Sequence, residues 1–163
     1  MELSLLYTGI IIFVLYCIAA IVLNGWNLPE SISATSYLSK DKFSTTAPFT
    51  IICIICAVCL FPAWIAVSPE NLQFLTFLSC AGMLFAGSTP LYKEELASKV
   101  HYTGGIVAFV CGLLWLVFTS IWTTISVIAI IGTVWTYFNK KNYTFIFETI
   151  GYLSTAIAVL RLL

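Results

Sequence analysis

The sequence predicts an all-α integral membrane protein: a bundle of six transmembrane helices forming a single domain over residues 1–163. Three observations lead to this fold class. Hydrophobic residues make up 61% of the chain and charged residues only 9%, whereas charged residues are about 25% of an average soluble domain. Six apolar segments of 16 to 20 residues follow one another along the chain. Six lysines fall in alternate connections between these segments.

The same composition excludes several classes of protein. There are too few charged side chains to cover a water-facing surface, so a soluble globular domain is excluded. A disordered chain needs low hydrophobicity and high net charge, and neither is present. The net charge is zero and no basic run occurs, so nothing in the sequence would attract a nucleic acid, and none is expected as a partner.

The six segments are interpreted as spans because a bilayer core about 30 Å thick needs about 20 helical residues. The first follows Glu2 with no basic residue before it, which favours a retained helix over a secretory signal peptide. The third is short and is extended by the polar residues before Pro90. Only Thr119 and Ser120 separate the fourth and fifth, which predicts a tight hairpin, since a single 37-residue helix is too long for one crossing. The predicted spans are 5–23, 48–67, 72–87, 102–118, 121–138 and 143–160.

The lysines indicate an orientation. They lie in the first, third and fifth connections, and the second and fourth connections contain no lysine or arginine. Short loops rich in lysine stay on the cytoplasmic side. We therefore expect a multi-pass protein of the cell membrane, with both termini on the outer side and the lysine-bearing loops inside. These residues are Lys40, Lys42, Lys93, Lys99, Lys140 and Lys141, and the one arginine is Arg161, near the C-terminus.

Two ionisable residues lie near the lysine-bearing ends of the predicted spans. Glu148 is inside the sixth span, where a charge costs about 2.5–3.5 kcal/mol and must face the bundle or water. It begins a stripe of small and polar residues at helical spacing, and His101 begins a similar stripe on the fourth span. Such stripes favour close helix packing, and a polar cavity is the alternative interpretation.

The first connection, residues 24–47, is long and rich in hydroxyl groups. A loop of this length either covers the mouth of the bundle or serves as a solvated linker. Together with the two ionisable residues, it supplies the candidate binding site. The candidate residues are Ser33, Ser36, His101, Glu148 and Tyr152.

The sequence shows little catalytic chemistry. All six cysteines lie in predicted spans, and although Cys53, Cys56 and Cys59 are regularly spaced, no second histidine completes a zinc site. Packing is the favoured interpretation of these thiols, and neither a metal nor a cofactor is expected. A Ser-His-Asp triad would have to combine His101 and Asp41 with a loop serine, and no nucleophile motif is present. Whether the protein is an enzyme stays open.

Two short segments carry a resemblance to known families. Pro29–Ser33 after the first helix and Val100–Gly105 at the start of a later one resemble the DUF998 and Frag1/DRAM-like families of six-helix membrane proteins. Those families similarly pair a serine-containing segment with a helix that begins with histidine. The resemblance implies that Ser33 and His101 are the matching positions. It also implies a link to lipid or lipid-anchor remodelling, which is known for some relatives.

Three functional hypotheses follow. The favoured one is binding of a lipid or small amphiphile in a polar crevice on the lysine-rich side, with a lipid-modifying activity left open. The alternative is a small proton-coupled transporter or channel that uses Glu148 and His101. The third is an accessory subunit without a site. Membrane lipid is the expected partner, and a homo-oligomer is compatible with the sequence.

Overall fold

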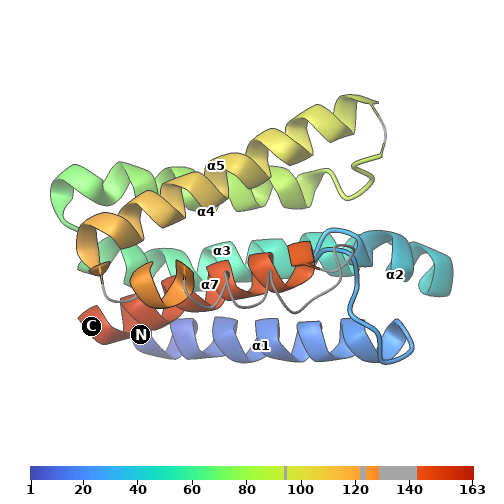
Figure 1. Cartoon of the computed structure of the whole chain (residues 1–163), viewed down its shortest axis with the longest axis horizontal. Helices are drawn as coiled ribbons and strands as arrows, with labels where there is room; N and C mark the ends of the chain where they lie inside the picture. Colours follow the sequence, from blue (N-terminus) through green and yellow to red (C-terminus); the bar gives the residue numbers. More distant parts are fainter. Residues whose placement is uncertain (94, 122–123, 129–142) are drawn as a thin grey trace.

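The computed structural model describes residues 1–93, 95–121, 124–128 and 143–163, and this part of the chain is helical, with no β-strand (Figure 1). Four helices in it are long and apolar enough to cross a membrane: α1, α3, α5 and α7. The predicted all-helical fold is thus confirmed for the described residues, and it contains helices that are suitable as membrane spans. The predicted fifth span, 121–138, lies mostly outside the described residues. The elements are α1 (Glu2–Leu23), α2 (Thr35–Phe43), α3 (Ala47–Val67), the short 3-10 helix η1 (Glu70–Leu72), α4 (Gln73–Ser88), α5 (Glu95–Thr119) and α7 (Tyr143–Leu162).

Most helix boundaries follow the apolar segments. The ends of α1, α3, α4 and α7 lie within three residues of the predicted first, second, third and sixth spans. Helix α5 differs from the predicted fourth span: it begins at Glu95 rather than near Tyr102. An acidic residue in the first turn complements the helix dipole, and Lys99 pairs with Glu95 at 3.9 Å on this exposed turn. The helix therefore extends beyond its apolar part.

Helix α2 lies within the first connection and was not anticipated from the sequence. It carries no long apolar run, and its stabilising features are local. Lys40 and Lys42 occupy its last turn, where positive charge is favourable. Ser44 ends the helix in the left-handed region, with φ of 57°. The long connection is therefore partly folded.

Four helices form a ring. Helix α3 packs against α4 and α7, and α5 packs against the same two helices, so that α3, α4, α5 and α7 close on one another. Helix α1 packs on the outside, against α3 and α7. Figure 1 shows these helices running along one common direction, with both chain termini at the same end of the bundle.

Helices α4 and α5 approach closely at two glycines. A Cβ atom placed on Gly82 would lie 2.5 Å from the carbonyl oxygen of Gly104 and 2.6 Å from the backbone nitrogen of Ala108. A Cβ atom on Gly104 would in turn lie 2.8 Å from the backbone nitrogen of Ala86. These contacts are with backbone rather than with movable side chains, so the crossing requires glycine.

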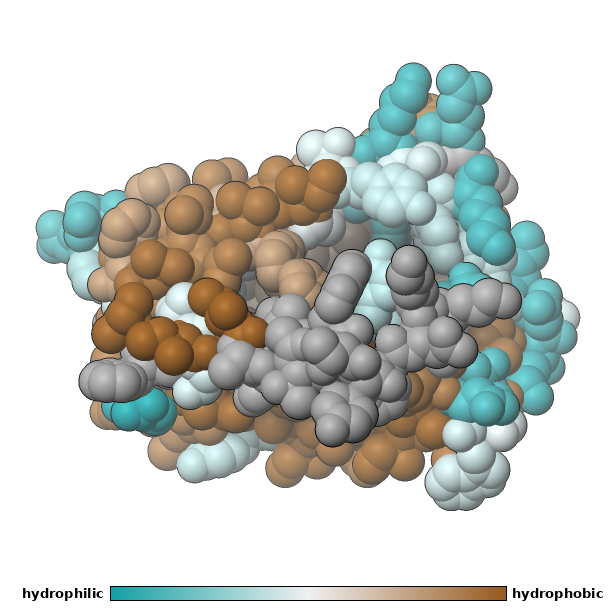
Figure 2. Space-filling view, in the orientation of Figure 1, coloured by the Kyte–Doolittle hydropathy of each residue, from teal (hydrophilic) through white to brown (hydrophobic). Residues whose placement is uncertain are grey.

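The outward faces of the helices are apolar. Ile11, Phe77, Ile106 and Phe118 are each more than half exposed. Figure 2 shows hydrophobic residues along the sides of the helices and hydrophilic residues concentrated at one end, on the right in this view. A water-soluble protein rarely exposes so much contiguous apolar surface, whereas lipid covers it without cost.

Candidate functional site

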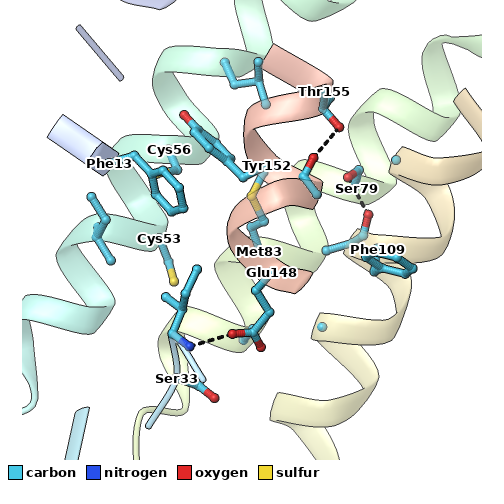
Figure 3. A pocket seen from close by; sticks show the side chains of 18 of the residues that line it. Phe13, Ser33, Cys53, Cys56, Ser79, Met83, Phe109, Glu148, Tyr152 and Thr155 are labelled. Atoms are coloured by element: carbon cyan, nitrogen blue, oxygen red, sulfur yellow. Dashed lines mark hydrogen bonds between the residues drawn. The ribbon is translucent and has the colours of Figure 1, made fainter. Parts of the chain in front are cut away.

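A cavity of about 210 Å³ lies inside the ring of α3, α4, α5 and α7 (Figure 3). Helix α1 and the first connection also contribute to its wall, through Phe13, Ile32 and Ser33. Most of the lining side chains are apolar, which suits a hydrocarbon group better than a polar molecule. The large apolar residues in this lining include Phe13, Phe49, Ile52, Leu60, Trp64, Met83, Phe109, Leu113 and Leu116.

The stripe on α7 faces this cavity along its whole length. Its members are Glu148, Gly151, Tyr152 and Thr155, and all four line the cavity. The stripe on α5 is divided between two neighbours. Gly105, Ala108 and Gly112 line the cavity, whereas Gly104 packs against the backbone of α4. The small residues of α5 and α7 therefore serve both helix packing and the cavity wall. The angle at which the helices cross decides whether a given small residue contacts a neighbouring helix or lines the cavity.

Glu148 is held at one end of the cavity by the first connection. Its Oε2 accepts a hydrogen bond of 2.6 Å from the backbone N–H of Ile32, shown as a dashed line in Figure 3. The backbone N–H of Phe145 donates to the carbonyl oxygen of Glu30 at 3.2 Å, which ties the same segment to the start of α7. Within the described part of the chain, no donor reaches Oε1 of Glu148. The carboxylate therefore has one free oxygen at the cavity.

His101 lines the same cavity from α5, and its side chain is buried. Its Nδ1 lies 3.0 Å from the carbonyl oxygen of Ala86, so Nδ1 carries a proton and donates it to that oxygen. Its ring stacks on Tyr92 with the centroids 4.9 Å apart. Among the described contacts, none is a hydrogen bond between His101 and Glu148. The structure thus places both residues around one cavity without linking them directly.

Ser33 and Ser36 have different surroundings. Ser33 lines the cavity, and its hydroxyl lies 2.9 Å from that of Ser31. Ser36 does not line the cavity, because its hydroxyl donates to the carbonyl oxygen of Pro90 over 2.6 Å. Of the five candidate residues, four therefore meet at the cavity and Ser36 joins two connections instead.

The first connection and residues 89–93 are joined at the same end of the bundle. The backbone N–H of Lys93 donates to the Tyr37 hydroxyl at 2.8 Å, and the Lys93 ammonium lies 4.7 Å from the centroid of the Tyr37 ring. Tyr92 packs edge-on against Tyr37 with the centroids 5.2 Å apart. Burial raises the pKa of Tyr92, which keeps its phenol neutral. These contacts hold the connection against the end of the bundle near His101.

Two buried polar atoms of the side chains that line the cavity have no hydrogen-bond partner among the described residues. They are the Tyr152 hydroxyl and the Trp64 indole nitrogen. Figure 3 shows the Tyr152 ring extending from α7 toward α3, beside Cys56. An unpaired buried donor costs about 1–3 kcal/mol.

The contribution of α3 to the site was not predicted from the sequence. Cys53, Cys56, Leu60 and Trp64 line the cavity from this helix. Their helical spacing gives no signal in the sequence, because α3 is apolar on every face. None of the six cysteines is in a disulfide, and the described residues contain no group of three possible metal ligands.

Comparisons with known proteins give no relative: no protein family, curated protein or solved structure matches this chain. What the cavity binds is therefore inferred from its geometry.

Proposed function

We propose that the protein binds a membrane lipid or small amphiphile, with the apolar chain in the cavity and the headgroup beside Glu148. The observation that carries this proposal is the combination of an apolar wall and a carboxylate with a free oxygen at one end of it. Ser33 and His101 lie around the same cavity. An amphiphile has the matching division between an apolar body and a polar end.

The cavity volume sets the length of the chain that it holds. An apolar cavity of about 150 Å³ binds benzene, which has six carbon atoms. In proportion, the present volume of about 210 Å³ corresponds to about eight carbon atoms. The occupant is therefore a short-chain amphiphile, or a longer one whose chain extends beyond the cavity.

Trp64 provides a direct measure of this binding. We expect an eight-carbon alcohol brominated at its far end to quench the fluorescence of the protein held in amphipol, because bromine would lie in the cavity against the Trp64 ring. The quenching should saturate with concentration. Fluorescence titration is the measurement, and the unbrominated alcohol should compete with the brominated one.

Two variants control this titration. Trp26 is 78% exposed in the first connection and does not line the cavity, so Trp26→Phe should retain the saturable quenching. Trp64→Phe should remove most of it. If quenching were linear in concentration, or unchanged in Trp64→Phe, the cavity would not be a binding site.

The family resemblance fits this proposal. Its two matching positions, Ser33 and His101, come from segments far apart in the chain, and both line the cavity. Membership of the DUF998 or Frag1/DRAM-like families is accordingly part of the proposal, as is a role in lipid remodelling.

Six membrane crossings are also proposed. Helix α5 ends at the end of the bundle that carries both termini, whereas α7 begins at the opposite end (Figure 1). The apolar segment 121–138, most of which lies outside the described residues, has the length of one further crossing. With α4 counted as a span, this makes six crossings.

The lysines support an orientation with the termini outside. Lys40 and Lys42 lie on α2 and Lys93 in the α4–α5 connection, and Figure 1 places both elements at the end opposite the termini. Arg161 is in the last turn of α7, at the other end. Lys140 and Lys141 fall outside the described residues.

A labelling experiment tests this orientation. A membrane-impermeant amine reagent should leave Lys93 unmodified in intact cells and modify it after permeabilisation, because Lys93 is expected on the cytoplasmic side. A lysine introduced by Leu163→Lys should be modified in intact cells and serves as the control. Modification of Lys93 without permeabilisation would reverse the orientation.

A further inference from the structure

The Glu148 carboxylate lies at the end of the cavity that would receive a headgroup, and no lysine or arginine described at the cavity pairs with it. One oxygen of Glu148 is bonded to the Ile32 backbone, and no donor from the described residues reaches the other. No lysine or arginine is among the residues that line the cavity in the described part of the chain. A carboxylate away from bulk water is stabilised by a positive charge or a strong donor.

The other groups around this end do not supply that charge. The proton on Nδ1 of His101 is directed to the carbonyl oxygen of Ala86. Lys93 is directed to the Tyr37 ring, outside the cavity. The Ser33 hydroxyl is engaged with Ser31. The unmet partner of Glu148 is therefore a donor, and a cationic one is the strongest.

We infer that the cavity selects amphiphiles with a primary ammonium headgroup, which would donate to the free oxygen of Glu148. This inference rests on the proposed function, since it names the class of headgroup for the same cavity. A neutral alcohol would form a weaker hydrogen bond with the same oxygen. A carboxylate or phosphate headgroup would be repelled by Glu148, because no lysine or arginine described at the cavity offsets its charge.

Three ligands with the same alkyl chain length and different headgroups separate the effect of headgroup charge on affinity from the effect of the chain. Octylamine, octanol and octanoate would each compete with the brominated alcohol in the Trp64 fluorescence titration, with the whole protein in amphipol at neutral pH. Octylamine should bind about tenfold more tightly than octanol, because a charge-assisted hydrogen bond is roughly twice as strong as a neutral one. Octanoate should bind more weakly than octanol.

Glu148→Gln is the decisive variant. Glutamine keeps an oxygen to accept from the Ile32 backbone N–H, so the first connection should stay in place. The preference for octylamine over octanol should fall from about tenfold to less than about threefold, because the charge is gone. The affinity for octanol should hardly change, which shows that the variant is folded.

Glu30→Gln is the matched control. Glu30 is exposed in the same connection, and only its backbone oxygen is bonded to Phe145. This variant removes a negative charge near the site without altering the cavity, so the preference for octylamine should survive. An equal loss in both variants would show non-specific attraction of cations and overturn the inference.

The outcomes distinguish this inference from the function on which it rests. If none of the three ligands competes, the proposed binding of amphiphiles is wrong. If octanol competes but octylamine has no advantage in the native protein, amphiphile binding stands and the selection of amines is wrong. A preference that persists in Glu148→Gln would also contradict the role of this carboxylate.

Discussion

Gly82→Ala is expected to lower the melting temperature of the purified protein by about 6–12 °C, from a loss of about 3 kcal/mol in stability. The new Cβ would lie 2.5 Å from the carbonyl oxygen of Gly104 and 2.6 Å from the backbone nitrogen of Ala108. Neither atom can move without displacing α5. Thermal unfolding followed by intrinsic fluorescence measures the change.

Gly105→Ala makes the same chemical change one residue after Gly104, in a different environment. A Cβ atom on Gly105 meets nothing within 4 Å. This variant should therefore keep its melting temperature or gain slightly, since alanine favours a helix over glycine by about 0.5–1 kcal/mol. Equal destabilisation by the two substitutions would show that the α4–α5 crossing differs from the one described.

Gly105→Leu should weaken binding of the brominated alcohol about 100-fold while leaving the fold intact. Gly105 lines the cavity and has open space around its Cβ position. A leucine side chain has four carbon atoms, about half of what the cavity holds by proportion. Excluding four carbons of the ligand costs about 3 kcal/mol at about 0.8 kcal/mol each, which is about 100-fold in affinity. The Trp64 titration measures this change.

A leucine on the outside of the bundle is the appropriate comparison. Ala19 is exposed on α1 and does not line the cavity, so Ala19→Leu should bind the alcohol as the native protein does. The melting temperature of Gly105→Leu should match that of Ala19→Leu. Unchanged binding in Gly105→Leu would place the ligand elsewhere, and a large loss of stability would mean that this part of the cavity is already filled.

The polar end of the site depends on contacts that no sequence pattern shows. The donor to Glu148 is the backbone N–H of Ile32, 116 residues away in the chain. Backbone groups are the same in every residue, so this pairing leaves no trace in residue identity. The same holds for Ser36, whose bond to the carbonyl oxygen of Pro90 removes it from the cavity. Ser33 and Ser36 could not be told apart from the sequence, because their side chains are chemically identical.

The sequence by itself determined the class of fold and the places of α1, α3, α4 and α7. Lipid requires each span to satisfy its backbone internally and to be apolar over about 20 residues, so length and hydropathy locate a helix without reference to its neighbours. The sequence also indicated Glu148 and Tyr152 as candidate site residues, because polar groups are costly inside a span and must face the interior of the bundle.

Only the tertiary structure decided which small residues close a helix crossing and which leave space. Gly104 and Gly105 are adjacent and chemically identical, yet one contacts the backbone of α4 and the other faces an open cavity. A turn of about 100° between successive helix residues separates the two environments, and the angle at which α4 and α5 cross sets their orientation. That crossing follows from the packing of all the helices together, so the cavity could not be predicted from any single segment.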